Sequence, residues 1–125
     1  MKKMIMQLRM SSAFLLTICL LMTMVFSSEE SLPERPINLV VTAERKGSMA
    51  IAQLKWKDQS NNEFGFEILR STNGNDFSVV GSVGANTEQY RDEVGRYING
   101  AFVYRVRAFN MKGKSEESNS ASVWF

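Results

Sequence analysis

The sequence predicts an all-β protein, a seven-stranded antiparallel β-sandwich that follows an N-terminal export signal. After residue 36 every apolar segment is short, and its apolar residues alternate with polar ones at the two-residue period of a strand. No segment there repeats apolar residues at the i, i+3, i+4 spacing of a helix. Turn signals separate the segments, at Asn73-Gly74, Asn99-Gly100 and Gly113. Short strands divided by such turns are typical of a sandwich.

The first 27 residues have the pattern of a secretory signal. Three basic residues precede an apolar run of 14 residues, Ala13–Phe26, and Val25 and Ser27 are small residues at positions −3 and −1 of a cleavage site. The run is shorter than the ~20 residues that a membrane-spanning helix needs. We therefore predict a cleaved signal at residues 1–27 and a secreted or periplasmic protein.

Two alternatives to cleavage remain open at this point. The signal can stay attached as a membrane anchor, or the chain can be a lipoprotein modified at Cys19, although Ile18 is larger than the small residue that such sites prefer. Cys19 is the only cysteine, so the cleaved chain has none and no disulfide. A domain of about 98 residues must then be held by its core alone, which is large enough for independent folding.

Removal of the signal changes the charge balance. Three of the 15 basic residues lie in the signal and all 13 acidic residues lie after it, so the cleaved chain has a net charge of −1. No stripe of lysine or arginine remains. Nucleic acid is therefore not an expected partner, and neither is a membrane surface after cleavage.

Residues 28–36 are polar, acidic and contain proline, which predicts a linker. The first two strands are expected at Ile37–Glu44 and Ala50–Lys57. Alternate residues of the second strand fall on one side: Ala50, Ala52, Leu54 and Trp56. Because the polar stretch Asp58–Asn62 then carries the chain to the other sheet, Trp56 is expected at the centre of the core.

The third strand is expected at Phe64–Ser71, with Phe66 and Ile68 inward, and Asn73-Gly74 predicts a two-residue hairpin turn after it. The fourth and fifth strands are expected at Phe77–Val83 and Thr87–Asp92, the latter carrying Tyr90. The sixth, Ala101–Asn110, has the clearest alternation, and the last is Ala121–Phe125. The expected core is Leu54, Trp56, Phe66, Ile68, Tyr90, Phe102, Tyr104 and Val106.

Five motifs along residues 36–125 resemble a fibronectin type III domain of the kind common in bacterial secreted proteins. They are Pro36-x-Asn38-Leu39, Leu54-Lys55-Trp56-x-Asp58, Asn62-Glu63-x-Gly65-Phe66-x-Ile68-x-Arg70-Ser71, Tyr90-Arg91-Asp92, and Tyr104-Arg105-Val106-Arg107-Ala108-x-Asn110-x-x-Gly113-x-Ser115-x-x-Ser118. The resemblance implies an immunoglobulin-like sandwich of fibronectin type III topology at residues 37–125. The related antibody-type sandwich is disfavoured, because its cysteine pair is missing.

The sequence departs from the family pattern at two places. Phe102 stands where the family usually has the tyrosine of its tyrosine corner, and Tyr104 on the same face is the expected partial substitute. The stretch Asp92–Gly100 is about two residues longer than the family norm, so an irregular corner is expected there. On this reasoning Phe102→Tyr should stabilise the domain by up to ~1 kcal/mol.

The residue types argue against catalysis. There is no histidine, and no cysteine after cleavage, which removes Ser–His and Cys–His nucleophile pairs and the common zinc sites. The acidic residues Asp58, Glu63, Asp76 and Asp92 are interpreted as turn caps, with Glu63 bonding backbone amides, because no calcium-loop spacing is present. We therefore expect a protein that is not an enzyme and has no cofactor or metal site.

One face carries a candidate partner-binding patch. If Phe102, Tyr104 and Val106 point inward, the outer face of the sheet made by strands four, three, six and seven collects apolar and basic side chains. These are Leu69, Arg105, Arg107, Phe109 and Trp124. Exposed aromatic and arginine side chains are enriched at binding hot spots. The alternative is that Trp124 folds over the sheet edge and Glu67 simply pairs with an arginine across strands.

These observations predict an exported, non-catalytic module that mediates protein–protein interaction or cell adhesion at the cell surface or outside the cell. The alternatives are a polysaccharide-binding accessory module, in which Trp124 stacks on sugar, and a purely structural spacer. The loop 110–115 has no Arg-Gly-Asp tripeptide, so integrin-type binding is not expected. The chain stops at its last predicted strand, as a piece of a longer multidomain protein would. Ligand identity and oligomeric state stay open.

Overall fold

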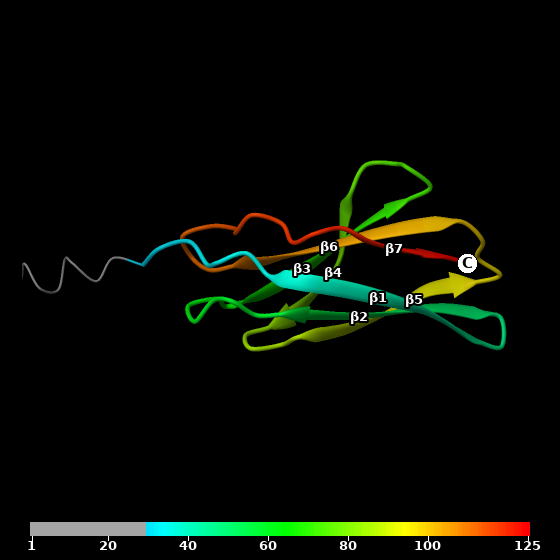
Figure 1. Ribbon diagram of the computed structural model, residues 1–125, viewed down its shortest axis with the longest axis horizontal. Helices are drawn as coiled ribbons and strands as arrows, with labels where there is room; N and C mark the ends of the chain where they lie inside the picture. Colours follow the sequence, from blue (N-terminus) through cyan, green and yellow to red (C-terminus); the bar gives the residue numbers. More distant parts are fainter. Residues whose placement is uncertain (1–29) are drawn as a thin grey trace, which may run out of the picture. The chain divides into compact units, whose positions relative to one another are not determined.

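The computed structural model describes residues 30–125, and they form two antiparallel sheets without a helix (Figure 1). The predicted signal, residues 1–27, Cys19 and the first part of the predicted linker lie outside the described residues. Within residues 30–125 no helix is long and apolar enough to cross a membrane. The predicted seven-stranded antiparallel sandwich is confirmed.

One sheet has the strand order β1-β2-β5 and the other β4-β3-β6-β7, with every pair antiparallel. We call them the three-stranded and the four-stranded sheet. The strands are β1 Ile37–Lys46, β2 Met49–Lys57, β3 Gly65–Thr72, β4 Ser78–Gly84, β5 Gln89–Arg96, β6 Ala101–Phe109 and β7 Ala121–Trp124.

Two strands run past their expected ends by more than one residue, β1 by two residues and β5 by four. β1 runs to Lys46 because its last residues pair with the start of β2, up to Lys46 opposite Met49. β5 begins at Gln89 and runs to Arg96, past the expected end at Asp92, because Glu93, Gly95 and Arg96 also pair with β2. The sequence had predicted an irregular corner over Asp92–Gly100, but this stretch is strand as far as Arg96. Pairing with β2 gives the backbone N–H and C=O groups of this stretch hydrogen-bond partners that an irregular corner would not supply.

The β3–β4 connection is longer than the two-residue hairpin that its sequence predicted. Asn73 and Gly74 do have positive φ, 50° and 78°, and the N–H of Asn75 donates to the carbonyl of Thr72 at 3.1 Å, which closes the turn. β4 nevertheless begins only at Ser78. The expected fourth strand therefore loses Phe77, which lies in the loop that projects from the sheet (Figure 1).

The core lies between the sheets, around Trp56 and Phe66. Their rings are 5.6 Å apart at an interplanar angle of 57°, and Trp56 is only 5% exposed. Seven of the eight residues expected in the core are buried, and Tyr90 is half-buried. The tryptophan before the polar stretch is thus a packing residue, and its large buried area stabilises a domain without a disulfide.

The segment before β1 packs on the domain from Ser31 onward. The Ser31 carbonyl accepts hydrogen bonds from the side-chain amides of Asn62 (2.9 Å) and Asn110 (2.8 Å), and Pro33 and Pro36 are buried. Residues 31–125 form one compact unit. The part of the predicted linker that the structure describes, 30–36, is therefore mostly fixed to the sandwich.

Candidate functional site

A polar cluster joins the two sheets inside the sandwich. The Asp92 carboxylate, from the three-stranded sheet, accepts hydrogen bonds at Oδ2 from an Arg70 guanidinium N–H (2.7 Å) and from the Tyr104 hydroxyl (2.7 Å), both on the four-stranded sheet. Asp92 is 6% exposed and Tyr104 fully buried. The interpretation of Asp92 as a turn cap is therefore wrong. It lies inside β5 and holds a buried ion pair.

The protonation states of this cluster follow from burial and from the carboxylate. Burial raises the pKa of the Tyr104 hydroxyl, and the hydrogen bond to the charged Asp92 raises it further. Burial lowers the pKa of Arg70, but the bond to Asp92 outweighs it and the net change is upward. At neutral pH the cluster is an ion pair with a neutral phenol. Because Asp92 and Tyr104 are buried, Arg70 is only 22% exposed, and both partners bond the same carboxylate oxygen, the cluster is structural.

The outer face of the four-stranded sheet carries a row of paired charges. Glu67 bonds Arg107 at 2.7 Å and Lys114 at 3.3 Å, while Glu117 bonds Arg105 at 3.1 Å and lies 4.0 Å from Arg107. Burial raises the pKa of Glu67, but the two basic partners outweigh burial and hold it below its usual value. The expected pairing of Glu67 with an arginine is present. Both arginines of the predicted patch are thus bound within the chain.

Leu69 was expected on the exposed face, and this expectation is corrected. It is 4% exposed. Its cross-strand neighbours are Val79 on β4 and Arg105 on β6, and the Arg105 guanidinium lies 4.2 Å above the ring of Phe77. This cation–π stack shields the outer side of the sheet at Leu69. The alternation of the sequence located Leu69 on the correct face of the sheet. It did not predict that the stacked Arg105 and Phe77 side chains would shield Leu69.

Phe109 and Trp124 lie at opposite ends of β6. Trp124 pairs with Ala101 and Gly65 pairs with Phe109, eight residues further along β6, which is roughly 26 Å. The Phe109 ring packs directly over the Cα of Gly65, where an added Cβ would meet ring atoms at 3.0 Å. Phe109 therefore covers a glycine in its own sheet. The five predicted residues do not form one patch.

Trp124 is the member of the predicted patch that faces solvent. Its side chain is 72% exposed, whereas Phe125 beside it points inward and packs edge-on against Phe102 with ring centroids 5.7 Å apart. We use the name Trp124 face for Trp124, its cross-strand neighbour Ala101, and the pair Val103 and Ser122 one step along the same face. The alternative in which Trp124 folds over the sheet edge is not what the structure has.

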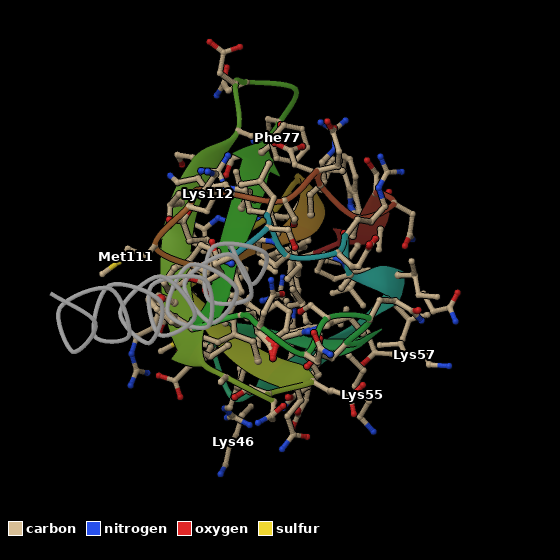
Figure 2. The ribbon with its side chains drawn as sticks, turned by 90° about the vertical axis from the view of Figure 1, so that its left-hand side faces the viewer. Lys46, Lys55, Lys57, Phe77, Met111 and Lys112 are labelled. Carbon is tan, nitrogen blue, oxygen red and sulfur yellow. The ribbon has the colours of Figure 1, made fainter. Side chains whose placement is uncertain are left out.

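The strands β1, β2 and β5 carry no aromatic side chain on the outer face of the three-stranded sheet, and the 82% exposed Tyr97 follows the end of β5. Lys55 and Lys57 of β2 project from the outer face into solvent (Figure 2). Glu44 lies 4.0 Å from Arg91 and accepts a hydrogen bond from Gln53. Such interspersed charges on a solvated sheet face are ordinary surface chemistry.

Solved structures with the same fold identify the architecture. No family model matches the chain, and no curated protein matches it. An Fn3-like protein from Clostridium thermocellum superposes with a TM-score of 0.58 at 19% identity, covering 74% of this chain and 92% of that one. The sixth fibronectin type III domain of human fibronectin type III domain containing protein 3 gives 0.56 at 17%, covering 78% and 89%. The chain has the fibronectin type III fold.

A titin segment of several domains superposes with a TM-score of 0.62 at 17% identity over 75% of this chain. The chain spans about a third of that segment, 32%. The expected topology and the observed one agree. At these identities the likeness concerns the fold.

Asp58 and Glu63, two acidic residues that were interpreted as turn caps, both accept hydrogen bonds from Ser60. Asp58 caps its turn as expected, accepting from the N–H (2.9 Å) and hydroxyl (3.1 Å) of Ser60. Glu63 was expected to bond backbone amides but instead accepts from the Ser60 hydroxyl at 3.0 Å. Among residues 30–125, no group of three or more carboxylates or other ligating side chains is placed to hold a metal ion.

Proposed function

We propose that this fibronectin type III domain is an exported, non-catalytic module that binds another protein through the Trp124 face. The observation that carries the proposal is the 72% exposure of the Trp124 indole on the last strand of the sandwich. Leaving so large an apolar side chain in water forgoes the ~1.5–3 kcal/mol that burial of such a side chain supplies. Tryptophan is also the residue type most enriched at binding hot spots.

The surroundings of Trp124 favour a protein over a sugar. Its neighbours Ala101 and Val103 on β6 are apolar, and Ser122 is the one polar residue of the face. The nearest basic residue on β6, Arg105, is already held by Ser120 (2.8 Å) and Glu117 (3.1 Å). A sugar ring stacked on an indole needs several polar groups beside it to fix its hydroxyls. The polysaccharide-binding alternative therefore lacks the second half of such a site.

Export is part of the proposal and rests on the signal pattern of residues 1–27. Intact-mass analysis of the protein recovered from the periplasm or the medium should give a chain that begins at Ser28. A chain that begins at a lipid-modified Cys19 would make the protein a lipoprotein instead. A chain of full mass in the membrane fraction would make it a signal-anchored protein.

The binding proposal is tested by photo-crosslinking in the producing cells. A photoreactive amino acid replaces Ser122, which is exposed beside Trp124, in the full chain. Irradiation should capture one main protein, and Trp124→Ala should abolish the capture. The matched control is Phe64→Ala, which removes a 54% exposed aromatic side chain at the other end of the four-stranded sheet and should leave the capture unchanged.

The outcomes separate the alternatives. Equal loss with Trp124→Ala and Phe64→Ala would mean that the Trp124 face is not the contact. Retention of the domain on insoluble polysaccharide, lost with Trp124→Ala and without any captured protein, would favour the accessory module. If neither a protein nor a polysaccharide is bound, the spacer remains.

A further inference from the structure

We infer that two copies of this domain pair through their β4 strands, edge to edge and antiparallel, so that the two four-stranded sheets become one continuous sheet. The inference is independent of the Trp124 face, which lies on β7 at the other edge of the same sheet. It rests on a comparison of the four strand edges of the sandwich. An unprotected edge carries free N–H and C=O groups that can pair with another strand.

Three of the four edges are protected. On β1, the Asn119 side chain bonds both the N–H and the carbonyl of Leu39 at 2.9 Å, and the strand ends in the charged residues Glu44, Arg45 and Lys46. β5 carries the charged residues Arg91, Glu93 and Arg96 outside the core, and its ladder to β2 is broken by a register shift at Ala50/Ile51. β7 is only four residues long. Charges, register shifts and short length are the ordinary means by which sheets avoid edge pairing.

β4 has little of this protection. Its sequence, Ser-Val-Val-Gly-Ser-Val-Gly over Ser78–Gly84, contains neither a charged residue nor a proline. Within residues 30–125 its backbone makes no hydrogen bond other than its ladder to β3. Val79 is 49% exposed at this edge. The pairing of β4 with β3 does have one register shift, between Ile68 and Leu69 of β3. Any strand that pairs with the free edge of β4 must accommodate this shift.

A second copy of β4 meets that condition. Val79 and Ser82 pair with Leu69 and Glu67 and therefore share the outer face, while Val80 and Gly81 lie toward the core and Tyr90. When two copies run antiparallel, one register sets Val79 opposite Ser82 of the second copy and Val80 opposite Gly81 of the second copy. Outer residues then meet outer residues and inner residues meet inner ones, in spite of the extra residue. A register that breaks this match would bring the wrong faces together.

The pairing also closes on itself. Because the same edge is used on both copies, the contact has two-fold symmetry and leaves no free β4 edge, so it gives a dimer and not a fibre. No like charges face each other across it, since the strand has none. The exposed Val79 side chains of the two copies come onto one shared outer surface. These features favour a second copy over a strand of unrelated sequence.

The test measures the mass of the exported chain by analytical ultracentrifugation from low to high micromolar concentration. The wild type should shift from one chain to two as the concentration rises. Ser82→Lys should abolish the shift, because a lysine on an edge strand blocks pairing, while its position opposite Glu67 keeps the fold. Thr42→Lys, which puts a lysine at an exposed site of the edge strand β1, is the matched control and should dimerise like the wild type.

Hydrogen exchange locates the contact. Amides of Ser78–Gly84 should become more protected at high concentration, and those of β1 and β5 should not. A wild type that stays a single chain at every concentration would overturn the inference, as would a dimer that persists in Ser82→Lys but is lost in Thr42→Lys. A dimer whose new protection lies outside β4 would overturn it as well.

Discussion

The hydroxyl of Tyr104 on β6 donates a 2.7 Å hydrogen bond to the carboxylate of Asp92 on β5, and this bond connects the two sheets through the core. The same carboxylate oxygen accepts from Arg70 on β3. In a domain without a disulfide among its described residues, this cluster is the polar link between sheets that otherwise meet through apolar side chains.

Asp92→Ala should destabilise the domain by up to about 3–5 kcal/mol, the cost of breaking a fully buried ion pair, because it leaves the Arg70 guanidinium, which is 22% exposed, without its counter-charge. Tyr104→Phe should cost less, about 1.5–3 kcal/mol, since it removes one hydrogen bond to a charged group and keeps the ion pair. Urea unfolding at neutral pH measures both. The control is Asp76→Ala, at an exposed loop position, which should change the unfolding free energy by less than ~0.5 kcal/mol. Equal effects of Asp92→Ala and Asp76→Ala would show that the cluster contributes nothing.

The same cluster predicts loss of stability in alkali. The pKa of Tyr104 is raised in the folded state, so above the ordinary tyrosine value of about 10 the unfolded chain releases this proton while the folded chain keeps it. The stabilisation is complete below that pH and is lost progressively as the pH rises. Unfolding free energies measured between neutral pH and strong alkali should fall more steeply for the wild type than for Tyr104→Phe. Parallel curves would contradict the assignment.

The lowered pKa of Glu67 predicts that the domain loses stability as the pH falls. Its folded-state pKa lies below the ordinary value of 4.5, so its contribution is present above that value and is lost as the pH falls through the folded-state pKa. Glu67→Gln should therefore destabilise the domain at neutral pH and flatten the acid limb of the stability curve. Glu93→Gln, at a carboxylate that is 60% exposed, should leave that limb as it is in the wild type.

How much the sequence could predict depends on the range of the interactions. Alternation along single strands predicted seven strands and located Trp56, Phe66 and Val106 in the core, because the period of side chains on a strand is a local property. The role of Asp92 depends on Arg70 and Tyr104, which belong to other strands and to the opposite sheet. A charged residue within a strand pattern gives no sign of such partners.

The prediction of a five-residue binding patch was wrong for the same reason. Leu69, Phe109 and Trp124 do share the outer face that alternation assigns to them. Their exposure, however, depends on residues from other strands: the Phe77–Arg105 stack shields Leu69, and the Phe109 ring packs onto the glycine opposite it. The hydrogen bond between Asn119 and Leu39 joins residues 80 positions apart, so a local sequence pattern could not predict it either. Of these three residues only Trp124, on the four-residue strand β7, is largely exposed.

Two glycines of β4 offer a matched test of close packing between the sheets. A Cβ on Gly81 would collide with the ring and hydroxyl of Tyr90, whereas a Cβ on Gly84 would meet nothing within 4 Å. Gly81→Ala should cost about 1–3 kcal/mol through the displaced tyrosine. Gly84→Ala should stay within ~0.5 kcal/mol of the wild type. Thermal unfolding of the two variants side by side decides the point, and equal midpoints would mean that Tyr90 moves aside freely.

The last two residues separate binding from folding most directly. Trp124 is 72% exposed, so Trp124→Ala should change the unfolding free energy by less than ~0.5 kcal/mol while it removes the proposed contact. Phe125 is 9% exposed and packs on Phe102, so Phe125→Ala should cost about 3–5 kcal/mol. Urea unfolding of both variants provides the comparison. If Trp124→Ala destabilised the domain as much as Phe125→Ala, the indole would be part of the core in solution and any loss of binding would reflect unfolding. If it left stability intact, loss of binding would have to come from the exposed ring itself.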